Sequence, residues 1–361
     1  MHAVRSPLRG SVAGTSAAIQ RRPVIAALVA VAGLVAATGS PVGASYPGST
    51  NGQLAFGVKD ADGNPQINVA APDGTGLKPL TTGAFFHACA AYSADGTRIA
   101  YCGNESGAFE IWTMNQDGTN PVQLTKLGGS ALFPDFSPDG KTVVFSGTEG
   151  TDTNSEIYTV DATTGGSLHA LTSCAAYKPG CYNNNASWSP DGTKIVFFHA
   201  DDADADGNGI DSQVWVMDAD GSNAHALTSD AAPKDQLPDW SPDGSKIVYE
   251  SGPLGSGGVW VMNADGTDQH QLTGCVAADA ASSLAPSGSA PAAPASCAAG
   301  DDFGPTWSPD GTQIAFIRAL SDTDRPVMVM NADGSNVHRL TAAPGVAFVP
   351  AWQPVGVPSA K

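Results

Sequence analysis

Short runs of apolar residues alternate with turn-forming residues along most of the chain, and the pattern repeats. The runs at 246–249 (Lys-Ile-Val-Tyr) and 194–197 (Lys-Ile-Val-Phe) are rich in β-branched and aromatic residues, which is typical of buried strands. Each run follows an aromatic-Ser-Pro-Asp-Gly phrase, such as 240–244. In this phrase proline fixes φ, aspartate favours a turn, and glycine takes the conformation that would strain a side chain. The repeated phrase therefore predicts a hairpin between two strands.

A second turn and a closing Leu-Thr complete each copy. Val259–Met262 is typical of a third strand, and it ends in an Asn-Ala-Asp-Gly turn at 263–266. A short fourth strand then ends at the Leu-Thr. Copies of four antiparallel strands predict an all-β, six-bladed β-propeller. The residues that open the copies are Tyr92, Phe136, Trp188, Trp240, Trp307 and Trp352, and those that close them are Thr81, Thr125, Thr172, Thr228, Thr273 and Thr341.

The two ends of the chain complement each other. The last copy contains only its first strand, around Trp352, whereas the first copy begins at 53–56, which matches the second strand of the other copies. We therefore expect the N- and C-terminal strands to pair and to complete one blade. Such a join closes the ring and leaves no long edge strand exposed.

These motifs resemble the TolB-like, WD-repeat-like β-propeller family of bacteria, whose hallmark is a Trp-Ser-Pro-Asp-Gly phrase followed by a Lys-Ile-Val-Phe strand. The resemblance covers residues 52–354. We expect no counterpart of the small α/β domain that precedes the propeller in TolB itself. Similar blades occur in a translocation-system protein, in peptidases and in polysaccharide lyases, so the resemblance implies the fold and leaves the function open. Ser-Pro-Asp-Gly is intact from Ser137, Ser189, Ser241 and Ser308, and reads Ser-Ala-Asp-Gly from Ser93.

Residues 1–44 have the features of an export signal. Four arginines precede an apolar run at 24–37, and small residues at 42–44 fit a signal-peptidase site. The apolar run is shorter than the roughly 20 residues that span a bilayer. We therefore expect a mature domain of residues 45–361, secreted or located in the cell envelope, without a membrane span.

The chain is acidic, with 35 Asp and Glu against 17 Lys and Arg and a net charge of −18. Nucleic acids and anionic lipids bind clustered basic residues, so neither is an expected partner. Many of the aspartates lie in the repeated turns. The charge therefore reflects turn chemistry in part, and does not by itself indicate a cationic ligand.

The chain contains six cysteines, which in an exported protein are expected to form disulfides. One pair flanks a predicted hairpin, and two would each staple a long loop between blades. A zinc site is the alternative, but no Cys-x2-Cys spacing supports it. Proximity favours the pairs Cys89–Cys102, Cys174–Cys181 and Cys275–Cys297.

Insertions gather on one predicted face of the ring. The connections between second and third strands, and between successive blades, hold all of them, whereas the other turns are short. Length variation confined to one face of a repeat ring is typical of a binding face. The inserted segments are 148–155, 173–186, 199–212, 274–305 and 319–325.

Residues just ahead of each first strand are expected to surround the mouth of the central channel on this face. They lie four and five positions before the opening aromatic, and together they are polar on one side and apolar on the other. Such a mixture suits a peptide or a sugar, although ordinary solvated loop residues have the same character. The candidates are His87, Asn183, Asn184, Asp235, Gln236, Asp302, Phe303 and Phe348.

One inserted loop has aspartates at alternate positions followed by glycine, as at the start of a calcium loop. The glutamate expected at position twelve is replaced by glutamine, and no flanking helices are predicted, which excludes an EF-hand. The alternatives are a helix-free Ca²⁺ site and an acidic solvated loop. The candidate ligands are Asp202, Asp204, Asp206, Asn208 and Asp211.

Sequence signatures of catalysis are absent: the chain has no Gly-x-Ser-x-Gly, His-Glu-x-x-His or Gly-x4-Gly-Lys. His87 with Asp235 or Asp302 is the only candidate pairing of a base with an acid. We therefore expect a monomeric, non-catalytic binding or scaffold module for a protein or peptide. The alternative is a carbohydrate-active lyase or hydrolase that acts on a polysaccharide in the central funnel, with calcium as support.

Overall fold

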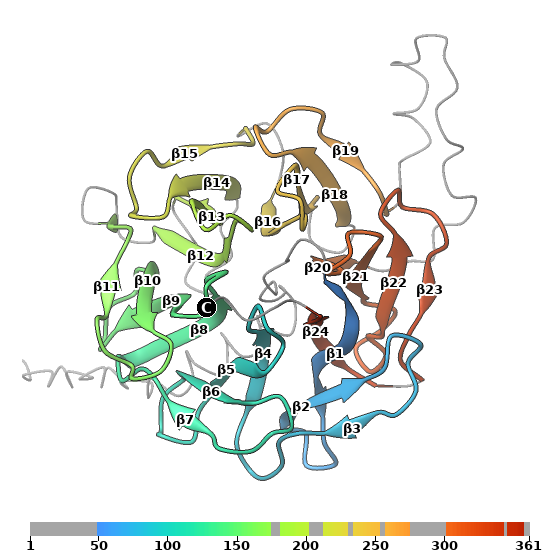
Figure 1. Ribbon diagram of the computed structural model, residues 1–361, viewed down its shortest axis with the longest axis horizontal. Coiled ribbons are helices and arrows are strands. Elements are labelled where there is room, and N and C mark those ends of the chain that lie inside the picture. Colours follow the sequence, from blue (N-terminus) through green and yellow to red (C-terminus); the bar gives the residue numbers. More distant parts are fainter. Residues whose placement is uncertain are drawn as a thin grey trace, which may run out of the picture.

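The computed structural model is a closed ring of six four-stranded antiparallel sheets (Figure 1). The innermost strands β4, β8, β12, β16, β20 and β24 surround the central axis. The predicted six-bladed β-propeller is confirmed. The structure describes residues 49–174, 181–201, 212–229, 234–252, 257–274, 301–342 and 345–356.

We number the blades along the chain. Blade 1 contains β4 (His87–Tyr92), β5 (Arg98–Gly103), β6 (Glu110–Asn115) and β7 (Val122–Gln123). Blade 2 contains β8 (Gly128–Phe136), β9 (Thr142–Glu149), β10 (Glu156–Asp161) and β11 (His169–Ala170). Blade 3 contains β12 (Tyr182–Trp188), β13 (Lys194–Ala200), β14 (Ser212–Asp218) and β15 (His225–Ala226).

Blade 4 contains β16 (Asp235–Trp240), β17 (Lys246–Ser251), β18 (Gly258–Asn263) and β19 (His270–Gln271). Blade 5 contains β20 (Asp302–Trp307), β21 (Gln313–Arg318), β22 (Val327–Asn331) and β23 (His338–Arg339). Blade 6 combines the C-terminal β24 (Ala347–Val355) with β1 (Thr50–Lys59), β2 (Pro65–Ala70) and β3 (Lys78–Pro79).

Blade 6 closes the ring as the sequence predicts. Strands β1 and β24 pair in antiparallel fashion, with Leu54 opposite Trp352 and Ala55 opposite Ala351. All four side chains are buried. The two ends of the described chain therefore lie side by side, and the inner edge of β1 is covered.

The repeated Ser-Pro-Asp-Gly turn is held by its own side chains. In blade 4 the amide of Lys246 donates to Ser241 Oγ at 2.9 Å, and the Ser241 hydroxyl donates to Asp243 Oδ1 at 2.7 Å. The amide of Ser245 donates to the same Asp243 oxygen at 3.0 Å. These contacts replace backbone partners that a tight turn cannot supply. The corresponding bonds form in the turns that begin at Ser93, Ser137, Ser189 and Ser308.

The threonine of the closing Leu-Thr is explained by a hydrogen bond within its own blade. Thr228 Oγ1 accepts a hydrogen bond from the amide of Val214 at 3.0 Å, which satisfies a strand amide where the short β15 has already ended. The same bond occurs in every blade. The other threonines are Thr81, Thr125, Thr172, Thr273 and Thr341.

A glycine in each turn between third and fourth strands allows neighbouring blades to approach closely. A Cβ on Gly74 would lie 2.2 Å from the carbonyl oxygen of Leu340, and φ at Gly74 is +80°. A side chain is therefore excluded by contact as well as by conformation. The equivalent pairs are Gly118–Leu80, Gly165–Leu124, Gly221–Leu171, Gly266–Leu227 and Gly334–Leu272.

Strand order places the insertions at one end of the ring. Because neighbouring strands are antiparallel, connections between second and third strands and between blades lie at the same end, which we call the loop-rich face. Its described parts include 150–155, 171–174, 272–274 and 319–326. The opposite end, the short-turn face, consists of turns such as 189–193 and 264–269.

The blade junctions generate a first prediction, a comparison of Gly74→Ala with Gly63→Ala. Both glycines have positive φ, +80° and +86°, so both substitutions incur about 1–2 kcal/mol of conformational strain. Only Gly74 faces a carbonyl, because no atom lies within 4 Å of a Cβ on Gly63. We expect Gly74→Ala to cost about 1–3 kcal/mol more, measured by denaturant unfolding. Equal losses would show that the junction tolerates a methyl group.

Candidate functional site

The predicted channel residues all lie at the beginning of innermost strands, where these strands meet the loop-rich face. Their exposed fractions are 1% to 5%, so their side chains are buried rather than open to solvent. Their role in ligand binding remains a prediction. They are His87 in β4, Asn183 and Asn184 in β12, Asp235 and Gln236 in β16, Asp302 and Phe303 in β20, and Phe348 in β24.

A bulge recurs in these strands. In β16 the pairing register shifts between Gln236 and Asp239, and Leu237 between them has φ of +56°. Left-handed conformations are rare for a residue with a bulky side chain, and a bulge bends the strand that carries it. The start of each such strand is thereby inclined relative to its end. The equivalent residues are Cys89, Phe133, Asn185 and Gly304, with φ from +51° to +61°.

Two buried aspartates link the innermost strands of neighbouring blades. Asp135 Oδ2 accepts from the amide of Trp188 at 2.9 Å, and Asp239 Oδ2 accepts from the amide of Trp307 at 2.8 Å. Burial raises the pKa of Asp239 well above its usual value, and the charge of Asp135 adds to this effect. Sequence reasoning missed both residues. The available signal was an aspartate directly before the opening aromatic in these copies.

His87 does not pair with either acid proposed for it. Its Nδ1 lies 2.9 Å from Gln66 Oε1, and its Nε2 lies 2.6 Å from Glu105 Oε1. Asp302 instead receives two hydrogen bonds from Arg318, at 2.6 and 2.7 Å. The candidate pairing of His87 with Asp235 or Asp302 is therefore wrong.

Two of the predicted disulfides are confirmed. Cys89 and Cys102 are joined across β4 and β5, with a Cα–Cα distance of 5.5 Å. Cys174 and Cys181 are joined at the junction of blades 2 and 3, with a Cα–Cα distance of 5.7 Å. The predicted pair Cys275–Cys297 lies outside the described residues, as do the calcium candidates Asp202, Asp204, Asp206, Asn208 and Asp211.

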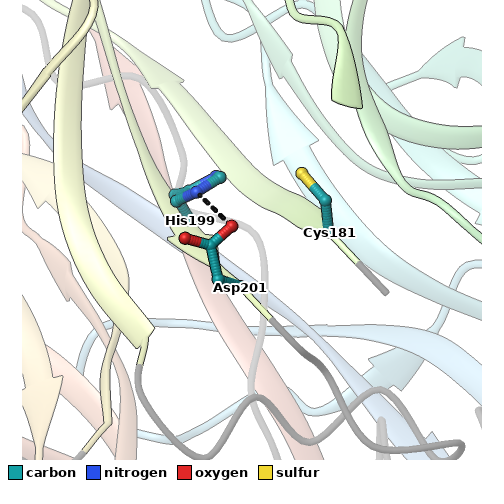
Figure 2. Close-up of side chains that lie close together, drawn as sticks. All are labelled: Cys181, His199 and Asp201. Carbon is teal, nitrogen blue, oxygen red and sulfur yellow. Dashed lines mark ion pairs between the residues drawn. The ribbon is translucent and has the colours of Figure 1, made fainter. Parts of the chain in front are cut away.

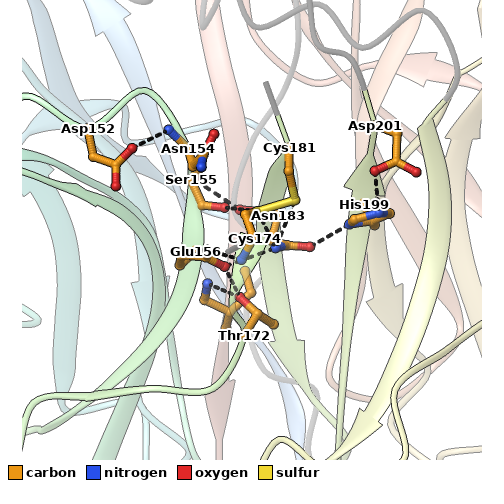
Figure 3. Close-up of a disulfide and its surroundings, with 11 residues drawn as sticks. Asp152, Asn154, Ser155, Glu156, Thr172, Cys174, Cys181, Asn183, His199 and Asp201 are labelled. Carbon is orange, nitrogen blue, oxygen red and sulfur yellow. Dashed lines mark hydrogen bonds and ion pairs between the residues drawn. A yellow bond between two sulfur atoms is a disulfide. The ribbon is translucent and has the colours of Figure 1, made fainter. Parts of the chain in front are cut away.

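The second disulfide lies in a dense polar cluster on the loop-rich face, which we call the blade 2–3 cluster (Figure 3). Asn183 Nδ2 donates to Glu156 Oε2 at 3.1 Å, and Asn183 Oδ1 lies 2.8 Å from His199 Nδ1. Asp201 Oδ1 in turn lies 3.4 Å from His199 Nε2. The cluster consists of Glu156, Thr172, Cys174, Cys181, Asn183, His199 and Asp201.

The short-turn face also contains a hollow, a cavity of about 610 Å³ between blades 3 and 4. Pro190, Lys194, Val216 and Trp240 contribute to its lining. Its position separates it from the inserted loops. We give the loop-rich face more weight as a functional site, because the polar clusters and the length variation are found there.

Comparisons with known proteins agree with this architecture. A family model described as the TolB beta propeller domain matches residues 35–206. The Tol-Pal system protein TolB of Anaeromyxobacter dehalogenans is 31% identical over 147 residues, which cover 40% of this chain and 29% of that protein. The propeller is TolB-like.

Other relatives of the TolB-like propeller support the same conclusion. Uncharacterized protein Atu1656 of Agrobacterium fabrum is 31% identical over 165 residues, 44% of this chain and 52% of that protein. The chain thus spans about half or less of these relatives. The crystal structure of TolB from Acinetobacter baumannii has a TM-score of 0.64 at 21% identity and covers 85% of this chain and 68% of that one, which supports the fold.

Within its described residues, the TolB-like propeller contains no helix that is long and apolar enough to cross a membrane. Two disulfides fit a protein of an oxidising compartment.

One further buried acid of the TolB-like propeller lies near the loop-rich face. Glu250 in β17 is 8% exposed, and its Oε2 has no hydrogen-bond partner within the described part of the chain. Burial raises its pKa from 4.5 to about 8, and the charges of Asp301 and Asp302 add to the rise while Lys234 opposes it.

Glu250 gives a second prediction. Between pH 4.5 and about 8 the unfolded chain has released this proton while the folded chain retains it, so the free energy of unfolding decreases as pH rises. Glu250→Gln cannot ionise. We expect the melting temperature of this variant, relative to the wild type, to increase across that interval and to level off above it. Exposed Glu149→Gln is the control, and a difference that does not vary with pH would contradict the assigned cause.

Proposed function

We propose that this chain is an exported, monomeric binding or scaffold propeller that recognises a protein or peptide on its loop-rich face without catalysing a reaction. The observation that carries the proposal is the confinement of long connections to that face. Turns on the opposite face are short and held by repeated side-chain hydrogen bonds. Binding residues are commonly placed on loops of variable length that a rigid scaffold supports.

Apolar side chains on the loop-rich face support a protein partner. Phe85 is 46% exposed and Leu320 is 39% exposed. Next to Phe85 in sequence, Phe86 packs edge-on against Phe109 and Phe348, with ring centroids 5.0 and 6.4 Å apart. Exposed apolar side chains of this kind are typical of the centre of a protein–protein interface, where few residues supply most of the affinity.

One relative and the features of an exported protein support the proposed partner and location. The TolB relative belongs by its name to the Tol-Pal system, which favours a role among protein partners. The net charge of −18 arises in part from acids of the repeated turns, so it does not define the partner. The predicted signal of residues 1–44 and the disulfides support export to the cell envelope or beyond.

A third prediction compares the two faces. Peptides are selected from a phage-displayed random library against the wild-type protein, and their Kd values are measured by isothermal titration. We expect Phe85→Ala/Leu320→Ala to weaken binding at least about tenfold, since each buried anchor is worth more than 1 kcal/mol. Leu77→Ala/Val337→Ala removes equally exposed side chains, 52% and 38%, from the short-turn face and is expected to bind normally. Weakening in the second variant alone would refute the assignment of the face.

Calcium at the aspartate-rich loop is a separate proposal, supported by the alternate acids from Asp202 to Asp206 and the following glycine. If the loop binds Ca²⁺, addition of the ion should raise the melting temperature, and a chelator should lower it, because the ion binds only the folded state. Asp204→Asn/Asp206→Asn is expected to abolish the response. An unchanged melting temperature with chelator would exclude a calcium site of structural importance.

A further inference from the structure

The blade 2–3 cluster brings together donor atoms of three metal-binding residue types. Cys181 precedes β12, whereas His199 lies near the end of β13 and Asp201 directly follows that strand. The three side chains converge on the loop-rich face (Figure 2). One donor atom from each lies within 4.8 Å of the others. Cys174 adds a second sulfur, because it forms the disulfide with Cys181.

Asn183 determines how His199 presents its ring. Asn183 Nδ2 donates to Glu156 Oε2 at 3.1 Å and to Cys174 Sγ at 3.4 Å, so its Oδ1 must be the atom that faces His199. That oxygen accepts from His199 Nδ1 at 2.8 Å. Nδ1 therefore carries a proton, and Nε2 is the nitrogen that faces Asp201. A hydrogen bond of this kind orients the histidine ligands of metal sites.

Contacts other than the disulfide bond also hold the side chains of the cluster in position. Glu156 accepts hydrogen bonds from the amide of Cys174 and from the hydroxyl of Thr172. The His199 ring lies 4.8 Å from the ring of Trp215. The Asp201 side chain is 62% exposed and leaves a path from solvent.

We propose that reduction of the Cys174–Cys181 disulfide converts the cluster into a tetrahedral zinc site, with Cys174 Sγ, Cys181 Sγ, His199 Nε2 and an Asp201 carboxylate oxygen as ligands. A dithiol reductant supplies two electrons and two protons and becomes a disulfide, while the Cys174–Cys181 bond breaks into two thiols. Zinc binding then releases both thiol protons to solvent. No other co-reactant is needed.

Three of the four donor atoms need only a small contraction, and the two sulfur atoms move apart once the disulfide is reduced. Zinc bonds of about 2.0–2.3 Å place the ligand atoms of a tetrahedron about 3.3–3.8 Å apart. The three donors already lie within 4.8 Å of one another, and the cysteine Cα atoms are 5.7 Å apart. Thiolate, imidazole and carboxylate together favour Zn²⁺ over Ca²⁺ or Mg²⁺, which prefer oxygen. While the disulfide is intact the chain offers no thiolate there, so metal binding depends on the redox state.

The other described disulfide provides an internal control. Cys89 and Cys102 lie in an apolar cluster with Phe109, Ile111 and Phe133. Reduction of this pair also yields two thiols. It differs from the blade 2–3 cluster in its apolar surroundings. A comparison of the two pairs therefore distinguishes metal binding by the cluster from metal binding by any pair of reduced cysteines.

The test uses the full mature chain with Cys275→Ser/Cys297→Ser as background, which leaves only the two described pairs. The protein is reduced with dithiothreitol, desalted without oxygen and titrated with Co²⁺, a coloured substitute for zinc. We expect one Co²⁺ per chain, with thiolate charge-transfer and tetrahedral d–d absorption that zinc displaces. The oxidised protein should show neither band. When Cys89→Ser/Cys102→Ser is added to the Cys275→Ser/Cys297→Ser background, the reduced protein should bind Co²⁺ as tightly as the background protein does.

The ligand variants decide the assignment. Cys174→Ser/Cys181→Ser should lose both absorption bands, and His199→Ala should weaken Co²⁺ binding at least about tenfold. Circular dichroism follows the fold in each state. The proposal is overturned if the reduced background protein shows no tetrahedral cobalt spectrum, or if either ligand variant binds as tightly as the background. It is also overturned if reduction abolishes the native spectrum and zinc does not restore it.

Discussion

The pairing of β1 with β24 is the constraint on which the architecture depends. Each blade buries its two faces only against its neighbours, as in other repeat proteins, so a ring that does not close leaves two blades half covered. The pairing of Leu54 with Trp352 joins residues from opposite ends of the chain, and the contact of Gly74 with Leu340 fits blade 6 against blade 5. Closure therefore gives blade 6 the same burial as blades that are continuous in sequence.

The two faces of the closed ring differ in how far the length of their connections can vary. On the short-turn face, serine and aspartate side chains supply the hydrogen bonds of each turn, and the glycine contacts between blades leave no space for insertion. On the loop-rich face, chain length varies, and the strand ends are held by contacts that differ from blade to blade. Arg318 with Asp302 and Asn183 with His199 are examples. Functional chemistry can vary there without loss of the ring.

The sequence predicts those features that depend on neighbouring residues or on the repeat. The Ser-Pro-Asp-Gly turn, the Leu-Thr closure, the strand order and two disulfides depend on neighbouring residues or on repetition, and they are confirmed. Contacts between blades were not predictable, because nothing in a single sequence indicates that Asp135 reaches the amide of Trp188 or that His87 reaches Gln66. The contact of Asn183 with His199 lies within blade 3 and was also not predicted, because His199 stands at the edge of an inserted segment.

Two groups of acids explain why net charge says little about the ligand of this chain. Hydrogen bonds from the Thr193 amide and the Ser189 hydroxyl lower the pKa of Asp191, and the same cause acts at other turns, so these carboxylates stabilise the fold at neutral pH and stop doing so in acid. Asp239 and Glu250 behave in the opposite sense, because burial raises their pKa values and their ionisation opposes folding. The turn acids are structural and numerous, whereas the buried acids are few and lie by the axis or near the loop-rich face. Acids relevant to binding are therefore better identified by burial and position than by composition.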